Sequence, residues 1–110
     1  LVYFQEGNMT HIRANRRGLG GVDQFKEKAF QEHIVNISIS TTFYIYSDGY
    51  QDQFGEHGKK YMNKRFKQLL SDIHEEPLGQ QYDTLLKEHL SWRNHKADQT
   101  DDILVIGCRV

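Results

Sequence analysis

The chain has 110 residues, enough for one domain, and a hydrophobic share of 37% with a charged share of 26% is typical of a folded rather than a disordered protein. A formal net charge of -1 disfavours nucleic-acid binding through a broad basic surface. No run has the apolar length of a membrane-spanning helix or a signal peptide. Because Cys108 is the single cysteine, an internal disulfide is excluded. We expect Cys108 to be a small buried residue, which fits a protein in a reducing, cytoplasmic setting.

The chain opens with two short strand candidates, 1–5 and 9–13, joined by a polar turn that contains glycine. This pattern predicts a β-hairpin. Because the first residue is not Met and already belongs to a strand candidate, we expect the chain to be a piece of a larger protein. The glycine-rich stretch 14–21 is predicted to be a loop, in which Arg16 or Arg17 is free to meet an anion.

Two further strands are predicted before the middle of the chain. Residues 35–40 alternate between apolar and polar side chains, which is the period of a strand with one buried and one solvated face. Residues 43–46 are aromatic and β-branched, and because they are apolar on both faces they predict an interior strand.

The period then changes from that of a strand to that of a helix. Apolar residues recur at helical spacing over 59–75, with lysines and arginines on the other face. Pro77 suits the first turn of a second helix, which Trp92 is expected to cap. His89 lies on its predicted apolar stripe, where a hydrogen-bonded packing histidine is the usual case. The full stripe is Tyr82, Leu85, Leu86, His89 and Leu90.

The chain closes with an apolar run, 103–110, which is predicted to be a final buried strand. Strands therefore come together before the helices, and a single strand follows them. This order predicts a single domain of the α+β class with an antiparallel sheet.

Two aspartates adjoin the most apolar strand candidates: Asp48 follows the run 43–46, and Asp101 precedes the run 103–110. If these runs pair as antiparallel neighbours, both carboxylates meet at one rim of the sheet. Like charges in that position need a cation or a proton, and hard oxygen ligands without a nearby cysteine favour Mg²⁺ or Mn²⁺. The alternative is that both aspartates only begin turns, and spacing alone favours this alternative.

Three pieces of the sequence carry a family resemblance: FYIYSDGYQDQFG at 43–55, GKKYMNKRFKQLL at 58–70 and DDILVIGCRV at 101–110. Together they resemble the C-terminal half of a stage II sporulation protein E-type serine phosphatase, a bacterial branch of the protein phosphatase 2C superfamily. The loop 14–21 is similar to the one that precedes the penultimate pair of strands in these domains. Nearly the whole chain is covered, and the order and spacing of the pieces are specific enough to favour a metal site over plain turns.

The resemblance implies that 1–110 is the C-terminal portion of one phosphatase 2C-like domain, with antiparallel sheets and flanking helices that form part of an α-β-β-α sandwich. It implies a dinuclear Mn²⁺ or Mg²⁺ centre in the complete domain, for which Asp48 and Asp101 match metal-ligand aspartates. The residues expected beside these ligands are Asp102, Asp52 and Gly49.

The chemistry implied by the resemblance is hydrolysis of phosphoserine or phosphothreonine in a bacterial signalling protein, such as an anti-sigma-factor antagonist. Two metals would activate the attacking water, so no protein nucleophile is needed. The family's other metal-binding segment lies upstream and is not in this sequence. We therefore expect the isolated chain to be inactive.

Two alternatives to a metal-dependent enzyme follow from the sequence. A non-catalytic regulatory or interaction module would keep the fold and lose the metals. A small α+β binding domain would use its aspartates only for turns. Whichever interpretation holds, we expect neither nucleic-acid binding nor membrane contact by this segment. Half a sandwich leaves an apolar face uncovered, so we also expect a homo-oligomer.

Overall fold

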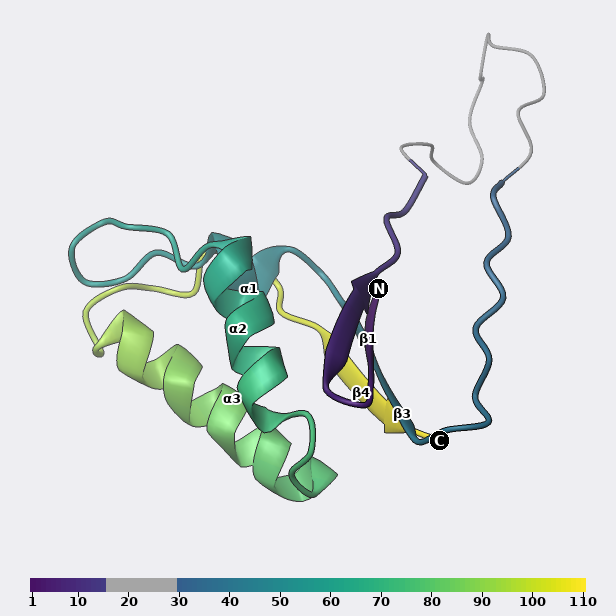
Figure 1. The fold of residues 1–110 in the computed structure, drawn as a ribbon. Helices are drawn as coiled ribbons and strands as arrows, with labels where there is room; N and C mark the ends of the chain where they lie inside the picture. Colours follow the sequence, from purple (N-terminus) through teal and green to yellow (C-terminus); the bar gives the residue numbers. More distant parts are fainter. Residues whose placement is uncertain (16–29) are drawn as a thin grey trace, which may run out of the picture.

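The computed structural model describes residues 1–15 and 30–110 (Figure 1). These ranges contain one four-stranded antiparallel sheet and three helices, which confirms the predicted α+β class. The elements in chain order are β1 (Val2–Gln5), β2 (Asn8–His11), β3 (Thr41–Tyr46), α1 (Gly49–Asp52), α2 (Asn63–Ile73), α3 (Leu78–Arg93) and β4 (Val105–Arg109). None of the helices in these ranges has the length and hydropathy that crossing a membrane requires. The predicted anion contact of Arg16 or Arg17 lies outside the described residues.

The strands lie in the order β2-β1-β3-β4, and each neighbouring pair is antiparallel. The predicted hairpin is β1–β2, whose two loop residues, Glu6 and Gly7, have φ values of 48° and 76°. Positive φ at both central positions is what a type I′ hairpin turn requires. Because β3 lies between β1 and β4, the prediction of an interior strand at 43–46 is confirmed.

The helices cover one face of the sheet, and the core lies between the two layers (Figure 1). Phe4 and Tyr44 reach it from the sheet, and Phe66 and Leu70 reach it from α2. Full burial of an apolar side chain of this size contributes about 1.5–3 kcal/mol to folding. The helical stripe predicted for 59–75 is thereby confirmed in α2, although the helix begins only at Asn63.

The strand predicted at 35–40 is not formed. These residues form no ladder with any strand of the described chain, and Ile37 is 54% exposed. The Asn36 side chain instead accepts a hydrogen bond from the Ser38 N–H at 2.9 Å, which closes a local turn. Alternation defines two faces, but an extended segment becomes a strand only when a partner satisfies its backbone.

The outer face of the sheet carries apolar side chains that no layer of the described residues covers. Ile45 of β3 pairs with Ile106 of β4, and the two are 53% and 50% exposed. The prediction that 103–110 is a buried strand is therefore wrong, and so is the prediction of a buried Cys108, whose thiol is exposed and free. The apolar composition of β4 predicted burial, but β4 is an edge strand of the described sheet, and no described element covers its outer face.

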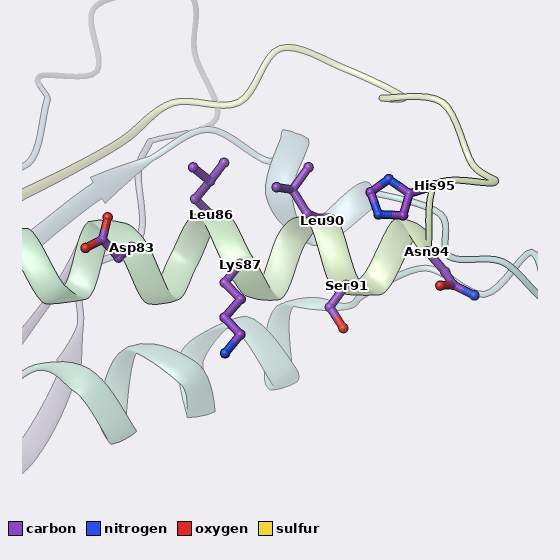
Figure 2. Close-up of a pocket in the computed structure, with 7 residues that line it drawn as sticks. All are labelled: Asp83, Leu86, Lys87, Leu90, Ser91, Asn94 and His95. Atoms are coloured by element: carbon purple, nitrogen blue, oxygen red, sulfur yellow. The ribbon is translucent and has the colours of Figure 1, made fainter.

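The predicted stripe of α3 is only partly buried. The buried positions are Gln81 and His89, whereas Leu86 and Leu90 project to one side of the helix and remain exposed (Figure 2). Polar contacts set this rotation, because the Gln81 amide oxygen accepts the Tyr44 hydroxyl proton at 2.6 Å in the interior. A buried side-chain amide needs hydrogen-bond partners, so the side of α3 that carries Gln81 faces the interior although the apolar stripe does not.

The end of α3 also differs from the prediction that Trp92 caps it. The C-cap is Asn94, with φ 47°, whose N–H donates to the carbonyls of Leu90 and Ser91. Asparagine tolerates this left-handed conformation better than most residues. Trp92 instead packs edge-on against the Tyr61 ring, with centroids 5.3 Å apart.

Candidate functional site

The antiparallel pairing of β3 and β4 places the residues after β3 beside the residues before β4. The Ser47 N–H donates to the Leu104 carbonyl at 3.0 Å. The Ser47 hydroxyl donates to the Asp102 carbonyl at 3.1 Å and accepts the Leu104 N–H at 3.1 Å. The turn that carries Asp48 and the segment that carries Asp101 therefore lie at one rim of the sheet, which we call the aspartate rim.

Gly49 allows the two sides of the aspartate rim to approach closely. A Cβ atom at this position would lie 2.2 Å from the carbonyl oxygen of Asp102, a distance that real Cβ contacts do not reach. The requirement is one of space, because it comes from a backbone atom that cannot swing away as a side chain can. Gly49, expected beside the ligands, is thus a packing position of the rim.

Asp48 occupies the N-cap position of α1 and is exposed to solvent. Its backbone carbonyl accepts the Asp52 N–H at 2.9 Å, but its carboxylate makes no cap hydrogen bond. Aspartate at an N-cap ordinarily uses its side chain to satisfy a free N–H. The turn here is closed by the backbone alone, and the carboxylate stays available at the rim.

Asp101 is also exposed, but its side chain is partly engaged. One carboxylate oxygen accepts the Asp102 N–H at 2.7 Å, and the Asp101 carbonyl accepts the Gln99 side-chain amide at 2.9 Å. The alternative interpretation, in which the aspartates only begin turns, thus fits Asp101 better than Asp48. The second carboxylate oxygen of Asp101 is left to face solvent or a ligand.

Asp52, expected beside the ligands, forms an ion pair. Its carboxylate lies 3.1 Å from the Lys60 ammonium nitrogen, and both side chains are substantially exposed. An exposed pair of this kind contributes at most about 1 kcal/mol to stability. Asp102 is exposed and contributes its carbonyl to the contacts of Ser47 and Gly49, so the structure assigns its backbone a role at the rim.

Gln53 is a residue that the sequence analysis missed. It is fully buried, and its side-chain amide donates to the Asp98 carbonyl at 2.8 Å while its side-chain oxygen accepts the Thr100 N–H at 3.1 Å. These bonds hold the segment that leads into Asp101. The only signal in the sequence was the place of Gln53 within Asp-Gln-Phe-Gly, since no periodicity marks a buried glutamine.

The donor set of the aspartate rim suits a hard divalent cation, because Mg²⁺ and Mn²⁺ favour carboxylate oxygens. Within residues 1–15 and 30–110, however, no group of three or more His, Cys, Asp or Glu side chains is close enough to hold a metal ion. The ligand type therefore fits the implied metals, whereas the number of ligands is that of a partial site.

Comparisons with known proteins identify the family of the chain. A sequence profile described as Stage II sporulation protein E (SpoIIE) matches residues 1–110. Among solved structures, the chain is similar to the SiaA-PP2C domain of Pseudomonas aeruginosa, with 32% sequence identity and a TM-score of 0.59. The match covers 64% of this chain and 29% of that chain, so this chain spans less than a third of the length of its structural relative. No curated protein matches the chain. The resemblance carried by the sequence motifs is thus confirmed.

Proposed function

The chain belongs to the stage II sporulation protein E family, and from this premise we propose that it is the C-terminal portion of a metal-dependent protein serine/threonine phosphatase domain. The observation that carries the proposal is the exposed carboxylate of Asp48, which makes no hydrogen bond to the helix that it begins and lies at a rim where Gly49 packs against the Asp102 carbonyl. A solvent-facing carboxylate on a closely packed turn is suited to binding a cation.

The proposed ligands from this chain are Asp48 and Asp101. A bound Mn²⁺ or Mg²⁺ pair would supply a water with lowered pKa and positive charge to offset that of a phosphate. The chain's own groups would hold the ligands in place: the Ser47 hydroxyl bridges the two sides of the rim, and the Gln53 amide fixes the segment before Asp101. Asp102 and Asp52 would lie beside the ligands.

The proposed substrate is a phosphoserine or phosphothreonine side chain of a cytoplasmic bacterial signalling protein, with an anti-sigma-factor antagonist as one such partner. The family membership supports this class of substrate. The near-neutral charge of the chain also disfavours recognition of nucleic acid through a broad basic surface.

One observation favours a second candidate function, a non-catalytic regulatory or interaction module on the same fold. Two carboxylates at the rim, without a third ligand among the described residues, do not complete a metal cage. A module of this kind would keep the sheet and the helices and use its surface to bind a partner.

Mn²⁺ titration of the chain in a calorimeter tests the proposed ligands. We expect weak binding, because two carboxylates leave most coordination positions to water, and we expect its loss in both Asp48→Asn and Asp101→Asn. Asp83→Asn, on the exposed surface of α3, is the matched control and should bind as the starting chain does. Binding retained in either rim variant would contradict the assignment of ligands. Absence of binding in the starting chain would contradict a metal site in this portion, and titration of the complete domain would then separate an incomplete site from a non-catalytic module.

We also propose that the chain self-associates through the uncovered outer face of the sheet, with a second copy as the occupant. The face pairs exposed Ile45 with exposed Ile106, and β4 is the edge of the described sheet. Light scattering at high micromolar concentration should give a mass above that of one chain. Ile45→Lys and Ile106→Lys should give monomers, whereas Leu90→Lys, on the exposed side of α3, should not. A monomeric mass for the starting chain would refute the proposal.

A further inference from the structure

An open groove of about 710 Å³ lies where the segment 59–62 meets α2 and the later turns of α3, and we call it the basic groove. Tyr61 is buried within it, and Leu69 and Trp92 are partly buried and pack against the core. The lining side chains of Lys59, Lys60 and 62–65 are exposed. Small-molecule sites enclose most of their ligand. An open groove with exposed walls therefore suits the surface of a macromolecule better.

The positive charges of the chain gather along this groove. The formal net charge of the chain is -1, but residues 57–71 contain five of its 14 lysines and arginines and no aspartate or glutamate. Four of these five cations line the basic groove: Lys59, Lys60, Lys64 and Arg65. A local excess of one sign on a nearly neutral protein attracts a partner of the opposite charge to that place.

Two carboxylates also line the basic groove, and each accepts a hydrogen bond from a neutral side chain. Glu88 accepts the Tyr61 hydroxyl proton at 3.0 Å, and Asp72 accepts the Gln68 side-chain amide at 2.8 Å. Neither carboxylate forms an ion pair with a lysine or arginine of the described residues. Because four cations face two carboxylates, the groove remains positive.

Most of the cations of the basic groove lack an anionic partner. Lys60 pairs with Asp52, the last residue of α1. Lys59, Lys64 and Arg65 form no ion pair with any residue of 1–15 and 30–110. The fold therefore leaves these three charges available to a partner from outside.

Arg65 is positioned by an aromatic ring instead of a carboxylate. Its guanidinium lies 4.4 Å from the centroid of the Trp92 ring, a contact that orients the side chain and leaves its charge uncompensated. A guanidinium in this state can bind a carboxylate through two parallel hydrogen bonds. The neighbouring Met62 is 59% exposed and adds an adaptable apolar contact to the groove.

We propose that the basic groove docks an acidic segment of a partner protein, with Lys64 and Arg65 bound to its carboxylates and Met62 against an apolar side chain. The carboxylates of Asp72 and Glu88 favour this occupant over a nucleic acid. A phosphodiester chain carries a charge at every link, whereas a peptide can place neutral residues opposite these carboxylates. The inference does not depend on the proposed phosphatase function, and its test includes neither a metal ion nor a phosphorylated residue.

The probe is a fluorescein-labelled peptide, Glu-Glu-Leu-Glu-Glu-Phe-Glu-Glu-Leu-Glu, whose binding is followed by fluorescence anisotropy. The salt concentration is about 0.1 M, at which exposed charges more than about 10 Å apart are largely screened from one another. Lys64→Glu should weaken binding about five- to tenfold, because it replaces an attraction in the groove by a repulsion. Glutamate is favourable in the first turn of a helix, so this variant should fold as the starting chain does.

Lys87→Glu is the matched control, because it makes the same change of charge at an exposed residue of α3 that does not line the basic groove. It should weaken binding by less than about twofold, since screening limits its effect on the groove. Equal weakening by Lys64→Glu and Lys87→Glu would show only a general attraction between charges and would overturn the proposal. So would the absence of binding to the starting chain.

Two further probes test the chemistry of the partner. The same peptide with glutamine in place of every glutamate should bind at least about tenfold more weakly, because its carboxylates are lost. A labelled single strand of oligothymidylate of the same number of units should also bind more weakly than the acidic peptide. Tighter binding of the oligonucleotide would refute a protein as the occupant, and equal binding of the glutamine peptide would refute recognition by charge.

Backbone amide chemical shifts locate the bound peptide on the starting chain without any substitution. The largest changes should fall on residues 59–65 and on Trp92, which line the basic groove. The amide of Asp83, which is exposed on α3 and does not line the groove, should change little and serves as the internal control. If the largest changes fell outside the groove, the assignment of this surface would be wrong.

Discussion

Replacement of Gly49 by alanine is expected to lower the free energy of unfolding by about 1–3 kcal/mol, the usual cost of forcing an extra methyl group into a packed site. The methyl carbon would lie 2.2 Å from the Asp102 carbonyl oxygen and 3.2 Å from a side-chain carbon of Ile103. Relief requires the turn at Asp48 to move away from the segment 101–103. The change should therefore disturb the aspartate rim and weaken any binding of Mn²⁺ there. Urea unfolding, followed by circular dichroism, measures the loss of stability.

Gly79→Ala is the matched control for this experiment. Gly79 lies in the first turn of α3, and apart from its chain neighbours and the nearby backbone of the helix, no described atom lies within 4 Å of the position that its Cβ would take. Alanine is favoured over glycine in a helix by up to about 1 kcal/mol, so this variant should be as stable as the starting chain or more stable. If Gly49→Ala were also as stable as the starting chain, the close approach at the rim would not be a constraint on the sequence.

Replacement of Gln53 by alanine is expected to lower the free energy of unfolding by about 3 kcal/mol, because it leaves buried partners unsatisfied and opens a cavity. The Thr100 N–H loses its acceptor, and the Asp98 carbonyl loses its donor. The damage should be greatest in the segment that precedes Asp101. Amide hydrogen exchange should show it directly, through faster exchange at Thr100 than the global loss of stability accounts for.

The control for Gln53 is a glutamine that the fold does not use in this way. Gln80 is exposed on α3, and Gln80→Ala should change stability by no more than about 0.5 kcal/mol. Unaltered exchange at Thr100 in Gln53→Ala would mean that other contacts hold the segment. Gln53 would then be a packing residue without a role in placing the aspartate rim.

Much of the fold follows from local patterns that the structure preserves. The glycine turn after Gln5 predicts the first hairpin, and the apolar run 43–46 predicts the central strand. The helical spacing of Phe66, Leu70 and Ile73 predicts the buried face of α2. The adjacency of the turn that carries Asp48 and the segment that carries Asp101 also follows from the sequence, because antiparallel pairing of two strands fixes which of their ends are neighbours.

The remaining features depend on partners that a local pattern does not specify. Residues 35–40 alternate as a strand does, but a strand needs a neighbour to satisfy its backbone. The exposure of Ile45 depends on what lies against the outer face of the sheet, which the order of residues along β3 cannot determine. The rotation of α3 depends on the buried bond between Gln81 and Tyr44, two residues that are far apart in the sequence.

Gln53 illustrates the same limit at the site itself. Its side chain forms hydrogen bonds with three backbone groups, the carbonyls of Phe54 and Asp98 and the N–H of Thr100. No pattern in the sequence predicts these contacts. The predicted packing position of His89 is confirmed by its burial, but neither ring nitrogen has a hydrogen-bond partner among residues 1–15 and 30–110. The sequence could not predict this, because it depends on which nearby groups already bond to one another, as the Tyr50 hydroxyl does to the Leu85 carbonyl.

The chain contains a single tryptophan, and its position gives the molecule a built-in optical reporter. The Trp92 indole N–H donates to the Gln53 carbonyl at 3.1 Å, and the Arg65 guanidinium lies 4.4 Å from the centroid of its ring. Fluorescence excited selectively in the indole thus comes from one known place, adjacent to the residue that holds the segment before Asp101. Its wavelength and quenching are set by the polarity and charge around the indole, which include the Gln53 carbonyl and the Arg65 guanidinium, so movement of that segment can be followed in solution without attaching a dye.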